Sequence, residues 1–202
     1  MKFLTEHITT QNKTRRSRFT RMCIGEAVIE LMKTAEYENI KISDIARRSG
    51  ISRMTFYHYY DSKLAALTDY LDEIILLYLK ESRKNPDVGR FQEYSHILFS
   101  LNFFDQYADY FLVMAQAGLY SVLINGINEF MTSRFTSGFK SSLYGLYYYA
   151  GALLNTFLKW EEGGKQEPAE RIAEIISRSL PAGIKGPAGI NVDKPFPVHY
   201  TS

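Results

Sequence analysis

The stretch that decides the fold is Lys41-Ile-Ser-Asp-Ile-Ala-Arg-Arg-Ser-Gly50-Ile-Ser-Arg-Met-Thr-Phe-Tyr-His-Tyr-Tyr60-Asp-Ser-Lys63. Ile42, Ile45 and Ala46 recur at helical spacing and predict the apolar face of a short helix. Gly50 ends this helix, because glycine accepts the left-handed conformation that a tight C-terminal turn requires. Ser52 is then placed to cap a second short helix through its side-chain oxygen. The pattern predicts a helix-turn-helix.

The second helix of this motif has an inward and an outward face. Phe56 and Tyr60, four residues apart, are predicted to face the core, while Ile51 fills the space between the two helices. In a helix-turn-helix, the outward residues of the first turns meet base edges in the major groove of DNA. Here those residues are Arg53, Met54, Tyr57 and His58. We therefore expect this segment to read DNA.

The segment from Ser52 to Leu67 is similar to the recognition-helix signature of tetracycline-repressor (TetR) family regulators. The matching positions are Asp44, Ile45, Ala46, Gly50, Tyr57, Tyr60, Lys63 and Leu67. The resemblance is strong over residues 19–70 and weak beyond them. Two positions depart from the family pattern. Glu36 stands where the family usually has a glycine, and Lys41 stands where a capping Ser or Thr is common.

The sequence shows no strand alternation and no internal repeat, so an all-α protein is expected. The TetR resemblance implies a three-helix DNA-binding domain joined by a long helix to a bundle for dimerisation and ligand binding. The sequence divides into a flexible arm, this DNA-binding domain, a regulatory and dimerisation domain, and an extended tail rich in Pro and Gly. The expected boundaries are 1–14, 15–62, 63–180 and 181–202. Disorder is the simplest interpretation of the tail, but its apolar residues leave open packing on its own domain or on a partner subunit.

Helix bounds follow from capping residues, glycines and prolines. The first helix is expected to begin between Arg15 and Thr20, and the long fourth helix to end before Asn85. Five further helices are expected over residues 88–103, 105–117, 119–135, 141–162 and 168–180.

The outward residues of the motif are assigned to bases or to the DNA backbone. Arg53 is expected to bind guanine O6 and N7, a contact that discriminates by about 1–3 kcal/mol, with a phosphate contact as the alternative. Met54 and the ring of Tyr57 are expected to touch thymine methyl groups, and the Tyr57 hydroxyl is expected to reach a phosphate. The remaining predicted contacts, several implied by the TetR resemblance, are Lys41, Ser43, Ser52, Thr55, His58, Tyr59 and Lys63. Replacing Lys63 is accordingly expected to weaken binding to all DNA and to flatten its salt dependence.

Positive charge is concentrated near this motif. The net charge of the chain is +2, but residues 1–63 hold 12 Lys and Arg against 7 Asp and Glu. Five bases and no acid lie between Lys13 and Arg21, among them Arg15 and Arg18. This basic run is predicted to neutralise phosphates or to enter the minor groove; a solvated charged tail is the alternative.

Composition argues against secreted, membrane and catalytic proteins. Cys23 is the only cysteine, so an intrachain disulfide is excluded and a reducing, cytoplasmic location is expected. The uncharged stretches 110–128 and 141–158 contain Asn and Gln or Ser and Tyr side chains, which argues against a bilayer span. The chain has no Gly-rich phosphate loop, no zinc motif and no nucleophile turn. We therefore expect no catalytic residues, no metal and no cofactor.

The segment from Phe91 to Trp160 is aromatic and poorly charged, so most of its surface must be hidden. Eighteen of its 70 residues are aromatic, and the TetR resemblance implies that such rings surround a small apolar or aromatic effector. The predicted pocket is Phe99, Phe103, Phe104, Tyr107, Tyr110, Phe111 and Tyr147. Packing of the same rings as an ordinary core is the alternative.

A homodimer is expected, because two recognition helices must lie about 34 Å apart to reach successive major grooves of a palindromic operator. The TetR resemblance places the dimer interface on the last two helices. The predicted interface is Gly145, Tyr148, Gly151, Ala152, Asn155, Ile172, Ile175 and Ile176. The small residues allow helices to approach closely.

Two functional hypotheses follow. The first is a homodimeric repressor that binds double-stranded DNA and releases a palindromic operator when an effector binds. The second is a TetR-like coactivator or adaptor, which a protein partner controls in place of a small molecule.

Overall fold

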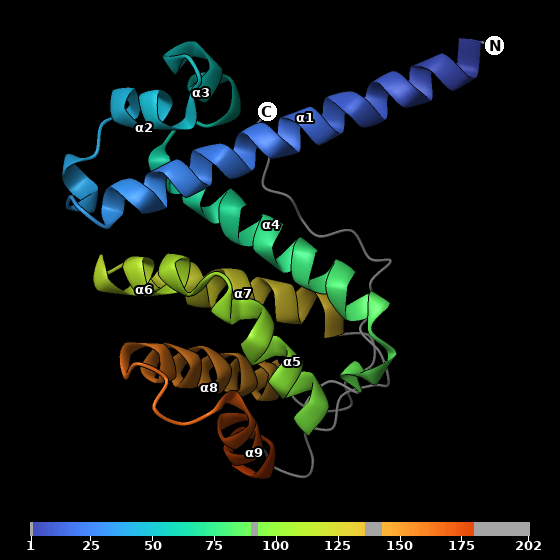
Figure 1. Ribbon diagram of the computed structural model, residues 1–202, viewed down its shortest axis with the longest axis vertical. Helices are drawn as coiled ribbons and strands as arrows, with labels where there is room; N and C mark the ends of the chain where they lie inside the picture. The colour runs from blue at the N-terminus through green and yellow to red at the C-terminus, as the bar shows by residue number, and fades with distance from the viewer. Residues whose placement is uncertain (1, 90–92, 136–142, 180–202) are drawn as a thin grey trace. The chain divides into compact units, whose positions relative to one another are not determined.

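The computed structural model describes residues 2–89, 93–135 and 143–179 (Figure 1). Within these ranges every regular element is helical, and no strand occurs. The elements are α1 (Lys2–Met32), η1 (Tyr37–Asn39), α2 (Ile42–Ser49), α3 (Arg53–Tyr59), α4 (Lys63–Lys84), η2 (Pro86–Val88), α5 (Tyr94–Asp105), α6 (Ala108–Gln116), α7 (Tyr120–Phe135), α8 (Leu143–Glu162) and α9 (Ala169–Ser179). The predicted all-α class is confirmed.

The chain forms two compact units, residues 1–73 and residues 74–202. The division falls inside α4, whereas the sequence places a domain boundary between residues 62 and 63. The predicted extended tail, residues 181–202, lies outside the described residues, and so does the expected start of a helix at Ser141.

Helix α1 begins at Lys2, well before the expected start between Arg15 and Thr20. The expected arm is helical here because no proline or glycine precedes Gly25, so nothing in the sequence stops the helix from extending toward the N-terminus. Gly25 itself marks a close approach to α4. A Cβ atom at this position would lie 2.5 Å from Cδ2 of Tyr70, so a side chain here would force the two helices apart.

The first unit is built on a core of fully buried aliphatic and aromatic side chains from α1 to α4. Each contributes roughly 1.5–3 kcal/mol by leaving water. The fully buried residues include Ile24, Val28, Ile45, Phe56, Leu67 and Leu71. Their spacing along each helix explains why α1, α2 and α4 present one apolar face to a common centre.

The turn between α2 and α3 has the predicted chemistry. Gly50 caps α2 in the left-handed region, with φ of 70°, and the Ser52 side chain accepts a hydrogen bond of 3.0 Å from the backbone N–H of Thr55. Lys41 occupies the N-cap position of α2 without a side-chain cap. The short helix η1 fills the connection where the family usually has a glycine, and Glu36 precedes it in an extended conformation.

The second unit is a bundle in which α9 packs against α5, α7 packs against α8, and α6 contacts both α7 and α8 (Figure 1). Its centre holds fully buried side chains from each of the helices that surround it. They include Ile97, Tyr110, Met114, Leu123 and Tyr149. Among the described helices, none is long and apolar enough to cross a membrane.

Candidate nucleic-acid interface

Helix α3 presents an exposed face made of its first two turns. Met54 is 78% exposed and Tyr57 is 51% exposed, and Arg53 and His58 are exposed beside them. Phe56 holds the opposite face, fully buried, with its ring 5.8 Å from that of Tyr57 in an edge contact. Large apolar side chains are seldom left this exposed at adjacent positions without a partner surface. The structure therefore brings together on one face the four residues that the sequence predicts to point outward.

Some of the side chains predicted to contact the DNA backbone are exposed, and others already form hydrogen bonds within the protein. Lys41 and Ser43 are exposed at the start of α2. The Ser52 hydroxyl caps α3 and lies 2.9 Å from the Thr55 hydroxyl, so both groups already serve the helix terminus. Tyr59 is half-buried. The cap fixes the N-terminus of α3, which is the end that approaches DNA in this motif.

Lys63 forms intramolecular contacts that the sequence did not predict. Its ammonium group donates hydrogen bonds to three backbone carbonyl oxygens, those of Tyr37, of Glu38 at 3.1 Å and of Ile40 at 3.0 Å. The ring of Tyr37 lies 4.3 Å from the same nitrogen. Three acceptors match the three N–H donors of a lysine ammonium.

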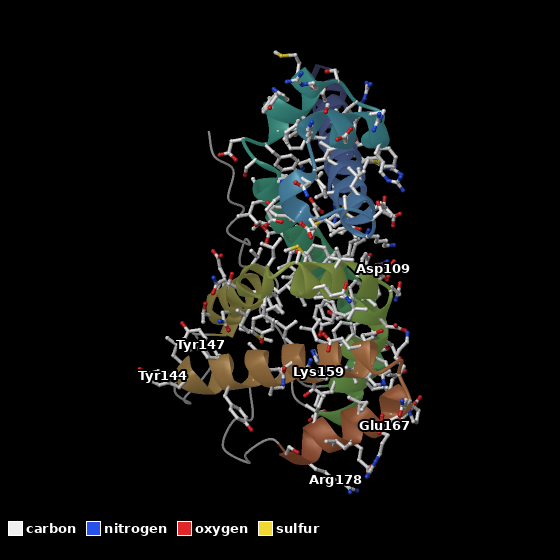
Figure 2. The ribbon with its side chains drawn as sticks, turned by 90° about the vertical axis from the view of Figure 1, so that its left-hand side faces the viewer. Asp109, Tyr144, Tyr147, Lys159, Glu167 and Arg178 are labelled. Atoms are coloured by element: carbon white, nitrogen blue, oxygen red, sulfur yellow. The ribbon has the colours of Figure 1, made fainter. Side chains whose placement is uncertain are left out.

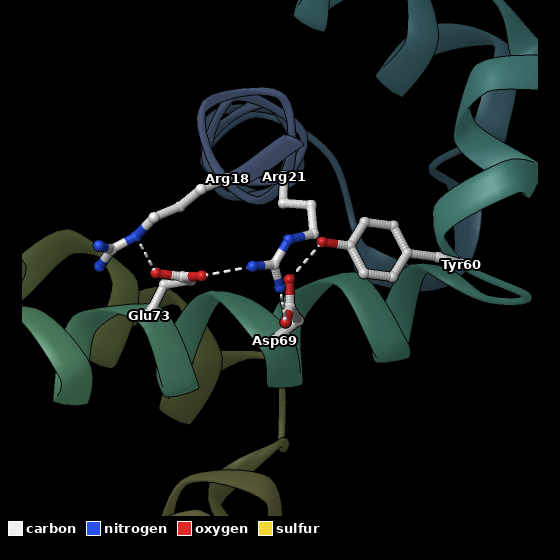
Figure 3. A network of polar contacts seen from close by, with 5 residues as sticks. All are labelled: Arg18, Arg21, Tyr60, Asp69 and Glu73. Carbon is white, nitrogen blue, oxygen red and sulfur yellow. Dashed lines mark hydrogen bonds and ion pairs between the residues drawn. The ribbon is translucent and has the colours of Figure 1, made fainter. Parts of the chain in front are cut away.

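A buried polar network joins α1 to α4 and to the end of α3 (Figure 3). Arg21 donates to Asp69 at 2.5 Å and to Glu73 at 2.6 Å. Tyr60, the C-cap residue of α3, donates its hydroxyl proton to the other oxygen of Asp69 at 2.5 Å. Burial and the adjacent carboxylate raise the pKa of Tyr60, so the phenol stays protonated and remains a donor.

This network also engages Arg18, whose guanidinium pairs with Glu73. Arg18, which the sequence predicts at phosphate, therefore has an intramolecular partner for its charge, whereas Arg15 is exposed. Sequence reasoning missed Asp69 and Glu73. Their signal was present, since two acids four residues apart interrupt the apolar face of α4 opposite two arginines of α1.

Six of the seven predicted pocket residues form one ring cluster in the second unit. Phe103 contacts Phe99, Phe104 and Tyr107, and Phe111 contacts Phe104 and Tyr110, with centroid separations between 5.3 and 6.3 Å. The seventh, Tyr147, is 40% exposed on α8 (Figure 2). It has no ring contact with the cluster among the contacts described.

Tyr78 of α4 joins this cluster, and sequence reasoning missed it. Its ring stacks on Phe104 at 5.0 Å and meets Phe99 and Phe103 at 5.7 and 5.4 Å. Its position in the apolar pattern of α4 indicated burial but not these partners.

A group of buried polar contacts lies beside the rings. The Tyr78 hydroxyl lies 2.6 Å from Nε2 of His96 and 2.9 Å from the Ser100 hydroxyl, and the Ser100 hydroxyl lies 2.8 Å from the carbonyl oxygen of His96. His96 also forms a hydrogen bond with the backbone of Gly89. Burial lowers the pKa of His96 to about 4.

The predicted dimer residues fall on two different surfaces. Tyr148 is 53% exposed, Asn155 is exposed, Ile175 is 44% exposed, and a Cβ atom built on Gly151 meets nothing within 4 Å. Gly145 and Ala152 are half-buried beside them.

Ile172 and Ile176 are buried in the bundle, where α9 packs against α5. The TetR resemblance predicts both residues in the dimer interface, whereas the structure buries them within their own bundle. The resemblance does not distinguish these two faces of α9, because both consist of apolar residues at helical spacing.

The α8–α9 connection holds a carboxylate pair with one lysine. Lys165 forms an ion pair with Asp105 of α5, and its Nζ lies 3.7 Å from Oε2 of Glu161. Burial of Glu161 and its hydrogen bond with Asp105 raise the pKa of Glu161 to about 7, against the opposing charge of Lys165. Trp160 donates its indole N–H to the carbonyl oxygen of Glu167 at 2.8 Å, which holds the connection in place. In the part of the chain that the structure describes, no group of three or more His, Cys, Asp or Glu residues is arranged to hold a metal ion.

The capped α3, the left-handed Gly50 turn and the buried Phe56 define a helix-turn-helix protein with a separate helical bundle. Residues 24–67 match the model of bacterial regulatory proteins of the tetR family. This match covers the helix-turn-helix and confirms the resemblance to the TetR family that the motif residues carry.

Sequence similarity to individual proteins is confined to a short segment, whereas similarity of fold extends over most of the chain. Over 45 residues the chain is 42% identical to the HTH-type transcriptional regulator EthR of Mycolicibacterium smegmatis, a match covering 22% of this chain and 21% of EthR. The structure of the dihydroxyacetone kinase operon activator DhaS aligns with a TM-score of 0.55 at 20% identity, covering 82% of this chain and 96% of DhaS. The structure of Thermus thermophilus FadR, a TetR family transcriptional repressor in complex with lauroyl-CoA, aligns with a TM-score of 0.51 at 21% identity. This alignment covers 81% of this chain and 94% of FadR.

Proposed function

We propose that this protein is a sequence-specific DNA-binding transcriptional regulator whose helix α3 reads the major groove. The observation that carries the proposal is the exposed face of α3, where Arg53, Met54 and Tyr57 project from a helix whose other face is anchored by Phe56. A guanidinium recognises guanine, and apolar side chains recognise thymine methyl groups, so this face supplies both kinds of base contact.

The proposed regulator acts as a homodimer on a palindromic operator. Two-fold symmetry places two recognition helices on successive major grooves, with half-sites about one helical turn apart. The exposed stripe of α8 that contains Tyr148, Gly151 and Asn155, with Ile175 of α9, supports this assembly. A Cβ atom at Gly151 would meet no described atom within 4 Å, and the absence of a side chain there allows a second helix to approach closely.

We further propose that a small apolar or aromatic effector binds the ring cluster and releases the operator. The FadR neighbour was solved with lauroyl-CoA, and its fold aligns with most of this chain. An effector has this result only if it binds the DNA-incompetent arrangement more tightly than the competent one. Repression is the mode that such release implies.

The test is selection of bound sequences from a randomised pool of duplex DNA, with the purified protein and no added ligand. Enrichment of a palindrome with half-sites about one helical turn apart supports the proposal. Binding that depends on salt but enriches no sequence contradicts it, because phosphate contacts alone carry no sequence information.

The selected operator then tests the assignment of Arg53. Arg53→Ala is expected to relax base preference at one position of each half-site, at a cost of about 1–3 kcal/mol for the preferred sequence. Arg47→Ala is the matched control, since Arg47 is an exposed arginine of α2 that pairs with Asp44. Equal losses on the operator and on random DNA for Arg53→Ala would contradict the assignment of Arg53 to a base.

A TetR-like coactivator or adaptor is the second candidate. The exposed aromatic side chains of α8, including Tyr148, favour it, because large exposed rings are enriched at protein interfaces. One structural neighbour, DhaS, is described as an operon activator. Purification with a stoichiometric protein partner supports this candidate. Effector-triggered release of the operator by the pure dimer contradicts it.

A further inference from the structure

Lys63 opens helix α4, and its side chain reaches back to the turn that precedes α2. Its Nζ donates to the carbonyl oxygens of Tyr37, Glu38 and Ile40, residues that lie 23 to 26 positions earlier in the chain. The face of the Tyr37 ring covers the same ammonium group at 4.3 Å. Three carbonyl oxygens and one aromatic face therefore surround a single charged nitrogen.

This arrangement uses the whole hydrogen-bonding capacity of the lysine. An ammonium group has three N–H donors and no acceptor, and three carbonyl acceptors lie within reach. The carbonyl groups of Tyr37 and Glu38 belong to the short 3-10 helix η1, and that of Ile40 follows it; the Tyr37 oxygen also accepts from the backbone N–H of Ile40 at 3.3 Å. The ammonium supplies charged donors to these oxygens, so the two sides of the contact satisfy each other.

The contact ties one end of the helix-turn-helix to α4. Ile40 lies two residues before α2 begins at Ile42, so Lys63 anchors the entry to α2. At the other end, Tyr60 closes α3 and donates to Asp69, also on α4. Helices α2 and α3 are thus attached to the first two turns of α4 both before α2 and after α3.

We propose that Lys63 is a positioning residue, which sets the orientation of the reading helix by capping the turn before α2 and contributes no phosphate contact. The proposal rests on the proposed function, namely that α3 reads DNA. A cation committed to three internal carbonyl groups releases no counterion when DNA binds. Loss of Lys63 therefore alters how α3 is presented and leaves the number of neutralised phosphates unchanged.

The experiment compares Lys63→Met with the wild-type dimer on the selected operator and on random duplex DNA over a range of salt concentrations. Affinity for the operator is expected to fall about tenfold, while affinity for random DNA and the slope of log K against log salt stay the same. Each variant is measured well below its own unfolding midpoint, so that only folded protein is compared.

Two outcomes of this comparison overturn the inference. The first is an equal loss on both DNAs with a shallower salt slope, by about 0.9 for each lost phosphate contact, since this is the behaviour of a phosphate clamp. The second is a lowered unfolding midpoint with unchanged affinity, slope and operator preference, since this is the behaviour of a group that only stabilises the fold.

Lys63→Arg separates charge from geometry. A guanidinium keeps the positive charge, but its planar fork does not direct three donors from one point toward three carbonyl oxygens. A positioning role predicts that Lys63→Arg loses operator preference as Lys63→Met does. Retention of wild-type preference by Lys63→Arg would overturn the inference.

Lys41→Met provides the matched control, because Lys41 is an exposed lysine at the start of α2 whose side chain caps nothing. Its loss is expected to weaken binding to both DNAs and to reduce the salt slope. A wild-type protein that enriches no operator would overturn the proposed function, and this inference with it. An operator-selective wild type whose Lys63→Arg variant is equally selective overturns the inference alone.

Discussion

The DNA-binding unit and the helical bundle are held together in different ways. In residues 1–73 the reading helices α2 and α3 have only 8 and 7 residues, and directional bonds from Lys63, Tyr60 and Arg21 fix their surroundings. In residues 74–202 helix α8 alone has 20 residues, and stacked or edge-on rings fill the space beside it. Short helices bury too little apolar area to fix their own orientation, so charged and polar ties take that role.

The largest expected effect concerns the ring cluster. Phe111→Ala removes a ring that is 2% exposed and contacts Phe104, Tyr110 and Phe157. If these rings are packed as a core, the free energy of unfolding falls by about 4 kcal/mol in a denaturant titration. Tyr147→Ala, from the exposed face of α8, is the control and is expected to change it by less than about 0.5 kcal/mol. A loss below about 1 kcal/mol for Phe111→Ala would indicate rings that line a preformed hollow.

The corresponding change in the DNA-binding unit is Arg21→Met. Its side chain is buried between Asp69 and Glu73, and removing the guanidinium leaves two carboxylates without their shared cation. The free energy of unfolding is expected to fall by about 3 kcal/mol, measured by denaturant titration. Arg48→Met breaks only the exposed pair with Glu30 and is expected to cost less than about 1 kcal/mol. Similar small losses for both variants would contradict the importance of the buried network.

His96 makes the stability of the bundle depend on pH. Because burial lowers its pKa from 6.5 to about 4, the unfolded chain binds a proton between these values that the folded protein excludes. Stability therefore falls as the pH decreases, by about 2 kcal/mol between pH 7 and pH 5. Unfolding of the wild type and of His96→Gln at several pH values measures this contribution as a difference in slope. Parallel profiles for the two proteins would exclude His96 as its source.

Glu161 is expected to make stability depend on pH in the opposite direction and by a smaller amount. Its pKa is raised from 4.5 to about 7, so the folded protein holds a proton that the unfolded chain has released. Stability then decreases as the pH rises from 4.5 to 7, by about 1 kcal/mol once solvent screening is allowed for. Glu161→Gln should remove this dependence and be the more stable protein at pH 8. Identical profiles for Glu161→Gln and wild type between pH 5 and pH 8 would contradict this assignment.

Local signals in the sequence determine the helix-turn-helix. Gly50, Ser52 and the spacing of Ile42, Ile45 and Phe56 act within one or two helical turns, so neighbouring residues suffice to predict them. The start of α1 was not predictable in this way, because no local stop signal separates the expected arm from the helix.

In the bundle, local sequence patterns do not show which way each apolar side chain points. Ile172, Ile175 and Ile176 are all apolar positions of α9, and periodicity alone does not show which of them face α5 and which face outward. The ring cluster presents the same limit. The spacing of its residues predicts burial, but the contacts of Phe111 with Phe157 and of Tyr78 with Phe104 join separate helices.

The sequence by itself determined the all-α class, the reading motif and the outward residues of α3, because short-range hydrogen bonds and helical periodicity are encoded in neighbouring positions. Only the tertiary structure decided the partners of the charged groups. Arg18 meets Glu73 across 55 positions of the chain, and Lys63 meets Tyr37 across 26. The position of a charge in the sequence does not reveal its distant partner, so only folding could bring these cations to carboxylates and carbonyl groups of the protein.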